Sequence, residues 1–201
     1  MPVLESFPEN IILENERVLL RPLSMDDHPN LLPFALNEPH IWKFSLVSAA
    51  GVEGLRNYMK LAIDGRNEGK EYPFIVYDKL QEKYAGTTRF YDINLPFQTL
   101  QLGYTWYGKD FQGTGLNRHC KYLLLKYAFE TLQMERVEFR ADVLNSRSVA
   151  AMKRIGCTVD GILRSNMPNR DGGRRDSIVL SILKEEWNFR IKEHLKELLE
   201  W

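Results

Sequence analysis

The chain has 201 residues, of which 44% are hydrophobic and 27% charged, and its 27 Lys and Arg residues balance 27 Asp and Glu residues. This composition is typical of a compact domain and excludes disordered, collagenous and coiled-coil chains. The absence of net charge and of long like-charge blocks excludes a general nucleic-acid binder. No apolar stretch reaches the roughly 18 residues of a membrane span, and no signal-peptide pattern opens the chain, so we expect a cytoplasmic protein with no membrane partner.

The cysteines and histidines give no metal or disulfide signal. Cys120 and Cys157 form no C-x-x-C pair and lie in apolar segments, which predicts two buried thiols. The four histidines are scattered, so no zinc site is expected.

Hydrophobic periodicity predicts alternating blocks of strands and helices. In chain order these are strand 17–23, a helix capped by Ser24, helix 52–66, strands 72–78, 84–93 and 99–107, helix 116–131, strand 136–143, helix 146–155, strands 158–164 and 176–183, and an amphipathic helix over 187–198. No repeat or linker divides the chain, so residues 1–201 are predicted to form a single domain. Strands before the long helix and strand-helix-strand units after it predict a mixed sheet covered by helices on both faces.

The segment between strand 99–107 and the long helix has the properties of an anion site. Gly113 and Gly115 allow a tight turn, in which successive N–H groups point at one place just where a helix begins. The helix N-terminus adds about half a positive charge, so a phosphate group is the expected ligand. The alternative is a tight strand-to-helix connection without a ligand. The segment matches neither a Walker loop nor a dinucleotide fingerprint.

Four motifs together resemble the GNAT superfamily of acyl-CoA N-acyltransferases. They are Leu102-Gly103-Tyr104-Thr105-Trp106, Gln112-Gly113-Thr114-Gly115-Leu116-Asn117, Asn145-Ser146-Arg147-Ser148 and Ile155-Gly156-Cys157. The resemblance is nearest to the branch of ribosomal-protein N-terminal acetyltransferases, and it runs from Arg21 to Val179. It implies an α/β (α+β) fold with a mixed, mostly antiparallel central sheet of about six to seven strands and helices on both faces.

The resemblance also implies acetyl-CoA as co-substrate and assigns the residues that bind it. The pyrophosphate loop falls on Gln112, Gly113, Thr114, Gly115, Leu116 and Asn117, where Asn117 replaces the small residue usual in the family. The strand that carries Thr105 and Trp106 is expected to splay from the strand that carries residues 141–143. The pantetheine arm is expected to insert between the two as an added strand would. Asn145 is expected to hold the pantetheine or acyl end, although an Asn at this place also serves as a helix cap.

Amine acylation requires a base for the ammonium group and a proton for the leaving thiolate. The family's usual Glu on the fourth strand is Gln101 here, which cannot accept the proton, so Glu138 or Asp142 is predicted as a substitute. Both could equally form ion pairs with neighbouring arginines. The Tyr that many relatives use for the thiolate is Met152, and Ser148 matches the serine of the ribosomal branch. Ser148 could instead be an ordinary residue at a helix start.

Trp42, Phe44, Arg89 and Tyr91 are expected to reach the acceptor pocket, with core or rim packing as the alternative for the aromatic side chains. The sequence thus predicts an N-acetyltransferase that transfers an acetyl group to a primary amine, on a protein N-terminus or a small molecule, directly in a ternary complex. The alternative is a non-catalytic acyl-CoA-binding or interaction module on the same fold. A homodimer is expected by analogy only.

Overall fold

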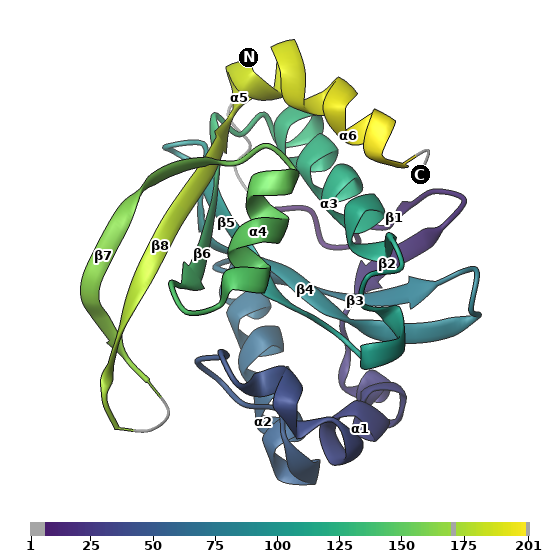
Figure 1. The fold of residues 1–201 in the computed structure, drawn as a ribbon. Helices are drawn as coiled ribbons and strands as arrows, with labels where there is room; N and C mark the ends of the chain where they lie inside the picture. The colour runs from purple at the N-terminus through teal and green to yellow at the C-terminus, as the bar shows by residue number, and fades with distance from the viewer. Residues whose placement is uncertain (1–6, 170–171, 200–201) are drawn as a thin grey trace.

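A computed structural model describes residues 7–169 and 172–199, and one sheet organises them (Figure 1). Its described strands are β1 (Leu13–Glu14), β2 (Val18–Pro22), β3 (Tyr72–Asp78), β4 (Lys83–Asn94), β5 (Thr99–Tyr107), β6 (Arg136–Asp142), β7 (Thr158–Pro168) and β8 (Arg174–Leu183). The order across the sheet is β1-β2-β3-β4-β5-β6-β8-β7. Every neighbouring pair is antiparallel except β5 and β6, which are parallel. The mixed, mostly antiparallel sheet is therefore confirmed.

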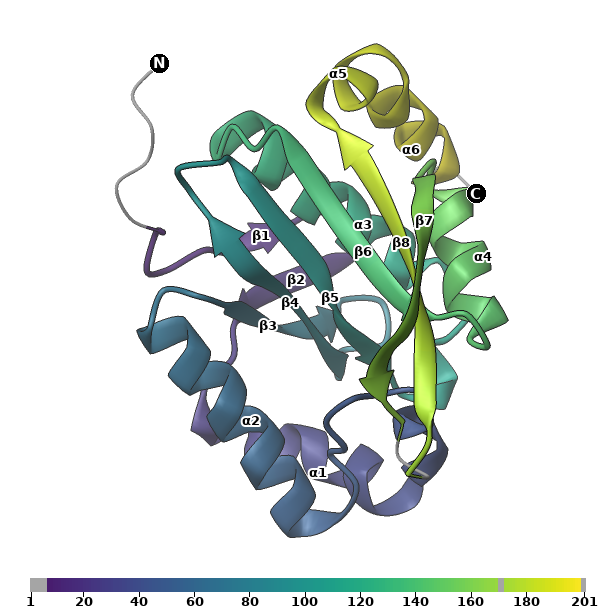
Figure 2. The ribbon, with the colours of Figure 1, turned by 90° about the vertical axis from the view of Figure 1, so that its left-hand side faces the viewer.

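Helices cover both faces of the sheet (Figure 2). The α-helices of the described chain are α1 (His28–Asn37), α2 (Gly51–Asn67), α3 (Leu116–Lys126), α4 (Ser146–Arg154), α5 (Lys184–Glu186) and α6 (Lys192–Leu199). Short 3-10 turns cover Met25–Asp27, Pro39–Trp42 and Lys109–Phe111, and π-helical turns cover Tyr127–Thr131 and Trp187–Ile191. No helix among the described residues is long and apolar enough to cross a membrane.

Strand alternation decides which helices pack on which face. Successive side chains of a strand point to opposite faces, and in β3 the residues Phe74 and Val76 pack with α3 and α6, whereas Ile75 packs with α1 and α2. Trp187, Ile191 and Leu195 are completely buried in the same apolar layer as Phe74 and Val76, as their spacing in the sequence predicts. The sheet is thus held between two apolar layers.

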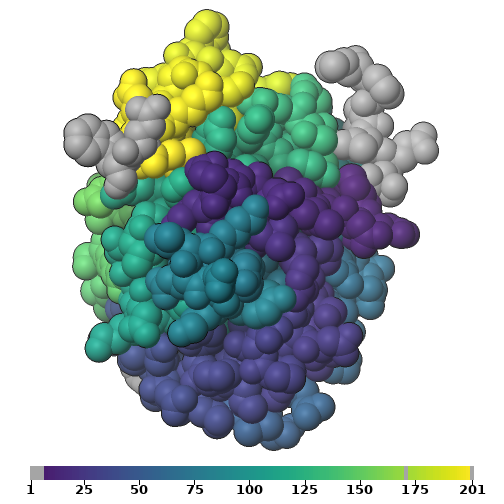
Figure 3. All heavy atoms as spheres, turned by 90° about the vertical axis from the view of Figure 1, so that its right-hand side faces the viewer, coloured from purple at the N-terminus to yellow at the C-terminus, as the bar shows by residue number. Residues whose placement is uncertain are grey.

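The sheet has one more strand than the expected six to seven. The additional strand, β1, has two residues and pairs with β2, and the Asn15 side chain accepts the N–H groups of Arg17 and Val18 between them. A two-residue strand is too short for any periodic signal. The hairpin formed by β1 and β2 lies on the surface beside the C-terminal helix (Figure 3). It also contacts α3, because Asn15 Nδ2 lies 3.0 Å from His119 Nδ1.

Candidate active site

The parallel strands β5 and β6 separate soon after they begin. They pair over only three residues, from Thr99 opposite Arg136 to Gln101 opposite Glu138. Beyond that point β5 continues to Tyr107 along β4, and β6 continues to Asp142 along β8. The edges that face each other across the gap form no further strand pairing among the described residues. Such edges can accept an extended segment as an added strand.

A β-bulge lies in β5 along this gap. Thr87 of β4 pairs with Trp106, but Arg89, two residues on, pairs with Gly103, three residues back, so β5 carries one extra residue. Tyr104 within the bulge has φ 48°, a left-handed conformation that is uncommon for a residue with a side chain. The Arg89 guanidinium lies 4.1 Å from the Tyr104 ring centre and the Tyr91 ring 5.0 Å from it. Bulges commonly redirect the backbone beside active sites.

The glycine loop before α3 has the open geometry expected of an anion cradle. Gly113 and Gly115 have φ 79° and 87°, and a Cβ added at either would meet no heavy atom of the described residues within 4 Å beyond its chain neighbours. The N–H groups of Gly113, Thr114, Gly115 and Asn117 donate to no backbone or side-chain acceptor in the described chain. Gly115 is the N-cap of α3, so the helix dipole adds to these donors. This arrangement fits the diphosphate of a coenzyme.

Side-chain hydrogen bonds join the cradle to its surroundings. Gln112 Nε2 donates to the Tyr107 carbonyl at 2.7 Å, and Gln112 Oε1 accepts from Arg147 of α4 at 2.6 Å. The Tyr107 hydroxyl donates to Asn117 Oδ1 at 3.2 Å. Asn117, the departure from the family pattern, therefore anchors the first turn of α3 to the end of β5. The hydrogen bond between Arg147 and Gln112 brings the cradle next to the start of α4.

The structure places Asn145 at the cap position of α4. Its Oδ1 accepts the N–H of Ser148 at 3.1 Å, which is a normal N-cap hydrogen bond. The Asn145 Nδ2 group and the half-buried Ser148 hydroxyl make no hydrogen bond within the described residues. The cap explains the position of Asn145, and its amide donor remains available for a ligand.

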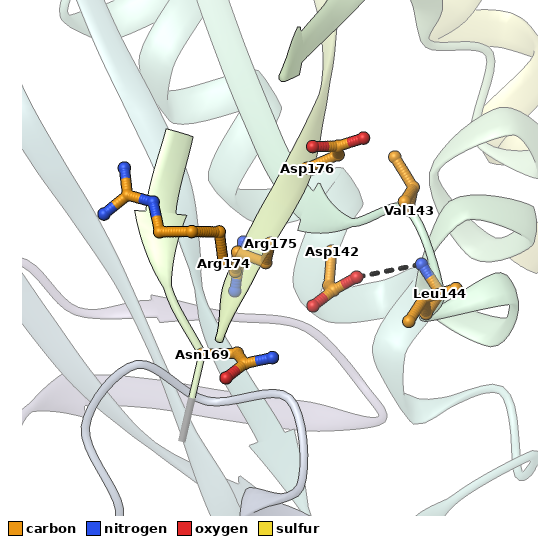
Figure 4. A pocket seen from close by; sticks show the side chains of 7 residues that line it. All are labelled: Asp142, Val143, Leu144, Asn169, Arg174, Arg175 and Asp176. Atoms are coloured by element: carbon orange, nitrogen blue, oxygen red, sulfur yellow. Dashed lines mark hydrogen bonds between the residues drawn. The ribbon is translucent and has the colours of Figure 1, made fainter. Parts of the chain in front are cut away.

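The two predicted bases have different surroundings. Glu138 accepts from Arg136 at 3.0 Å and from Arg140 at 2.6 Å, so its oxygens already have cationic partners. Asp142 is 8% exposed, and one of its oxygens accepts the N–H of Leu144 at 2.9 Å. Asp142 lies in a cavity of about 240 Å³ between the end of β6 and the β7–β8 hairpin. Figure 4 shows its carboxylate turned toward this cavity.

The predicted acceptor residues are distributed over three environments. Phe44 lies near the cavity, because its carbonyl accepts from Arg175, a lining residue, at 3.3 Å. Trp42 is completely buried and its ring lies 4.6 Å from that of Trp106. Arg89 is 4% exposed and its Nη1 lies 2.6 Å from Glu71 Oε2. Arg89 and Tyr91 both contact the ring of Tyr104 in the bulge.

Sequence reasoning missed a buried lysine beside the gap. Lys121 of α3 is 6% exposed, and its Nζ donates to Thr105 Oγ1 at 2.9 Å. Burial lowers the pKa of Lys121 to about 8. The available signal was its position beside Cys120 and one turn before Leu125, on the buried face of the long helix.

The predicted thiols are buried. Burial raises the pKa of Cys120 to about 11 and that of Cys157 to about 12. Neither thiol has the low pKa of an activated nucleophile. No group of three or more potential metal ligands occurs among the described residues.

A separated parallel pair beside a glycine-led helix N-terminus is the arrangement that the sequence resemblance implies for acyl-CoA N-acyltransferases. Comparison with known proteins gives the same class. The family model described as "Acetyltransferase (GNAT) domain" matches residues 17–158. The chain therefore belongs to the GNAT acetyltransferase family and is an N-acetyltransferase. Members of this family use acetyl-CoA.

The chain is also similar to individual acetyltransferases. The Bacillus subtilis protein "Putative ribosomal N-acetyltransferase YdaF" is 32% identical over 103 residues, which are 51% of this chain and only 55% of that relative. "Probable N-acetyltransferase YjcK" of the same organism is 27% identical over 87% of this chain and 98% of its own length. The crystal structure of a "putative acetyltransferase" from T. thermophilus has a TM-score of 0.85 at 32% identity, covering 98% of this chain and all of that one.

Proposed function

We propose that this protein transfers an acetyl group from acetyl-CoA to a primary amine, directly within a ternary complex. One observation carries the proposal, namely the unpaired gap between β5 and β6 that begins after Gln101. The cradle of open N–H groups lies just beyond the end of β5. A coenzyme held there by its diphosphate can extend its arm along the gap. The bound coenzyme supplies an activated thioester carbonyl.

The chain's own residues would share the work of binding and positioning. Backbone donors from Gly113 to Asn117, together with Gln112, would hold the diphosphate, and the β5 backbone at Thr105 and Trp106 would line the arm. The unused amide donor of Asn145 is suited to a carbonyl oxygen. The Ser148 hydroxyl would donate a hydrogen bond to the sulfur as charge develops there.

We propose Asp142 as the group that removes the proton from the amine. Its carboxylate faces a cavity, whereas the oxygens of Glu138 are held by Arg136 and Arg140. Deprotonation at pH 7 costs about 1 kcal/mol for the α-amino group of a peptide and about 4 to 5 kcal/mol for a lysine-like amine. A carboxylate at the acceptor's entrance assists this step directly or through water. Phe44, beside this cavity, would contact the acceptor. The substrate roles of Trp42, Arg89 and Tyr91 stay predictions.

The acceptor is proposed to be a protein or peptide N-terminus. The support is the name of the YdaF relative, which refers to ribosomal N-acetylation. Three sequence predictions are kept as proposals, namely a single catalytic domain over residues 1–201, a cytoplasmic location and a homodimer. The sheet supports the first of these because it joins strands from Leu13 to Leu183.

The test begins with thermal unfolding in the presence of acetyl-CoA, coenzyme A and ATP. A ligand at 100 times its Kd adds about 2.7 kcal/mol of stability, so acetyl-CoA and coenzyme A should raise the melting temperature and ATP should not. Release of coenzyme A thiol is then measured with peptides, polyamines, amino acids and aminoglycosides as acceptors. No stabilisation by either coenzyme form would refute the proposal.

The second candidate, a non-catalytic acyl-CoA-binding module, is favoured by Gln101. Its Nε2 donates to Asp92 at 2.8 Å and its Oε1 is buried with no hydrogen-bond partner in the described chain, so no carboxylate occupies the usual position of the base. Binding of acetyl-CoA without acylation of any amine would support this second candidate.

A further inference from the structure

Lys121 reaches from α3 to both strands of the separating pair. Its Nζ donates to the Thr105 hydroxyl of β5 at 2.9 Å and lies 5.8 Å from the ring centre of Phe139 of β6. Thr105 Oγ1 also lies 2.7 Å from Thr88 Oγ1 of β4. The amino group is therefore fixed beneath the gap, on the face of the sheet that α3 covers.

Among the described residues, no group of opposite charge pairs with the buried Lys121. Three of the other buried charged residues have a partner of opposite charge within 2.7 Å, namely Asp27 with Arg21, Asp78 with Arg17 and Arg89 with Glu71. Within residues 7–169 and 172–199, the only hydrogen-bond acceptor of Lys121 Nζ is a hydroxyl. Lysine is almost never fully buried unless it is paired.

The titratable side chains near Lys121 are neutral at pH 7. Cys120 on α3 and Cys157 after α4 influence Lys121, and burial raises both thiol pKa values well above neutrality. The strands contribute the hydroxyl groups of Thr88 and Thr105 and the ring of Phe139. An ammonium group has three donors, so two N–H bonds of Lys121 have no acceptor among the described residues. A ligand that brings a carbonyl oxygen would satisfy them.

Lys121 also lies on the route between the two parts of the coenzyme site. It follows Gly115 by six residues, which places its Cα about 9 Å further along the helix axis. An arm that joins a diphosphate at the cradle to a thioester in the gap passes this region. That arm offers amide and thioester carbonyl oxygens and carries no charge.

We infer that Lys121 is a coenzyme-binding residue whose ammonium group donates a hydrogen bond to a carbonyl oxygen of the pantetheine arm of acyl-CoA. The inference rests on the proposed function. Thr105 takes a defined part in it, because its hydroxyl orients the ammonium group toward the gap. A hydrogen bond from a charged donor in a dry site is among the stronger contacts that a neutral carbonyl can make.

The test compares Lys121→Met with Lys126→Met by titration calorimetry. Met is similar in length but neutral, and Lys126 is an exposed lysine on the same helix. The ligands are acetyl-CoA and adenosine 3′-phosphate 5′-diphosphate, which keeps the nucleotide and the diphosphate but lacks the arm. We expect Lys121→Met to weaken acetyl-CoA binding at least tenfold and nucleotide binding less than twofold, with neither changed by Lys126→Met.

Two further measurements separate binding from folding. Without ligand, Lys121→Met should melt at the same or a higher temperature, because replacing a buried charge by an apolar side chain is often neutral or stabilising. Acetyl-CoA binding to the unmodified protein should weaken as the pH rises through about 8, the pKa of Lys121, because the complex favours the protonated amine. Lys121→Met should lose this dependence, and Lys121→Arg should bind without it.

The outcomes are distinguishable. Unchanged acetyl-CoA affinity in a folded Lys121→Met protein would overturn the inference and leave the proposed function standing. An equal loss for both ligands would also overturn it, since Lys121 would then act on the nucleotide or on the fold. If the unmodified protein binds no acetyl-CoA, the proposed function itself fails. Should Lys121→Met not fold, a Lys121→Arg protein with the unmodified pH dependence would be the overturning result.

Discussion

Gly115→Glu is the sharpest test of the coenzyme cradle. Gly115 caps α3 in the left-handed conformation. Apart from Gly115 and its two chain neighbours, no described residue has a heavy atom within 4 Å of the position that a Cβ would take. A glutamate side chain is therefore not blocked by the protein and occupies the space proposed for the diphosphate. The left-handed conformation costs a residue with a Cβ about 1–2 kcal/mol, so the substitution should destabilise the free protein only moderately.

The expected loss of affinity is much larger than this cost. A carboxylate about 5 Å from a single phosphate charge, at an effective dielectric constant of about 20, is repelled by roughly 3 kcal/mol. That energy corresponds to about a hundredfold in Kd, before the lost space is counted. Acetyl-CoA binding should therefore fall by two orders of magnitude or more, as measured by titration calorimetry.

Gly69→Glu is the matched control. Gly69 also has a positive φ, 71°, and it follows α2 on the other face of the sheet. Beyond its chain neighbours, no described residue lies within 4 Å of an added Cβ. Both variants should lose similar stability, as measured by urea unfolding, and only Gly115→Glu should lose acetyl-CoA. Unchanged affinity in folded Gly115→Glu, or an equal loss in both variants, would refute the assignment of the cradle.

Three further predictions concern the acyl end of the site. Ser148→Ala should lower kcat more than it changes the Kd for acetyl-CoA, and an unaltered rate would remove Ser148 from the mechanism. Cys120→Ala and Cys157→Ala should leave turnover largely intact, and lost activity in a folded variant would indicate an acyl-cysteine route. Asn145→Asp keeps the cap acceptor but lacks the amide donor, so the affinity for the coenzyme should fall while the free energy of unfolding in urea stays the same. Asn145→Ala lacks both groups, so it should also lose about 1 kcal/mol of stability. Equal coenzyme affinity in all three Asn145 proteins would leave the residue a cap only.

Much of the fold was predictable because its elements carry local signals. Strand 72–78 and the long helix from Leu116 follow directly from apolar periodicity, and their positions are confirmed. The extension of β7 to Pro168, beyond the predicted end at 164, was not predictable. This part of the strand, Ser-Asn-Met-Pro, shows no alternation of apolar and polar residues, and it pairs with β8 across a hairpin. Such pairing leaves no hydrophobic pattern in the sequence.

The candidate site likewise contains features that a local sequence signal predicts and features that depend on how strands pair. The glycine cradle depends on residue types within one short loop, so the sequence could predict it. The bulge at Tyr104 depends on how β5 is registered against β4, and register is a property of two strands rather than of one. A tyrosine gives no local indication of a positive φ, in contrast to a glycine.

Arg89 and Tyr91, which the sequence predicts at the acceptor pocket, both contact the bulge at Tyr104. Arg89 stacks on the rings of Tyr104 and Tyr58, at 4.1 and 4.8 Å from their centres, and Tyr91 packs edge-on against Tyr104. The Tyr58 hydroxyl lies 3.2 Å from the Tyr104 carbonyl, to which it donates a hydrogen bond. These contacts offset the cost of about 1–3 kcal/mol of holding a non-glycine residue in this conformation. A polar and aromatic cluster behind β5 thus stabilises the backbone distortion that borders the gap.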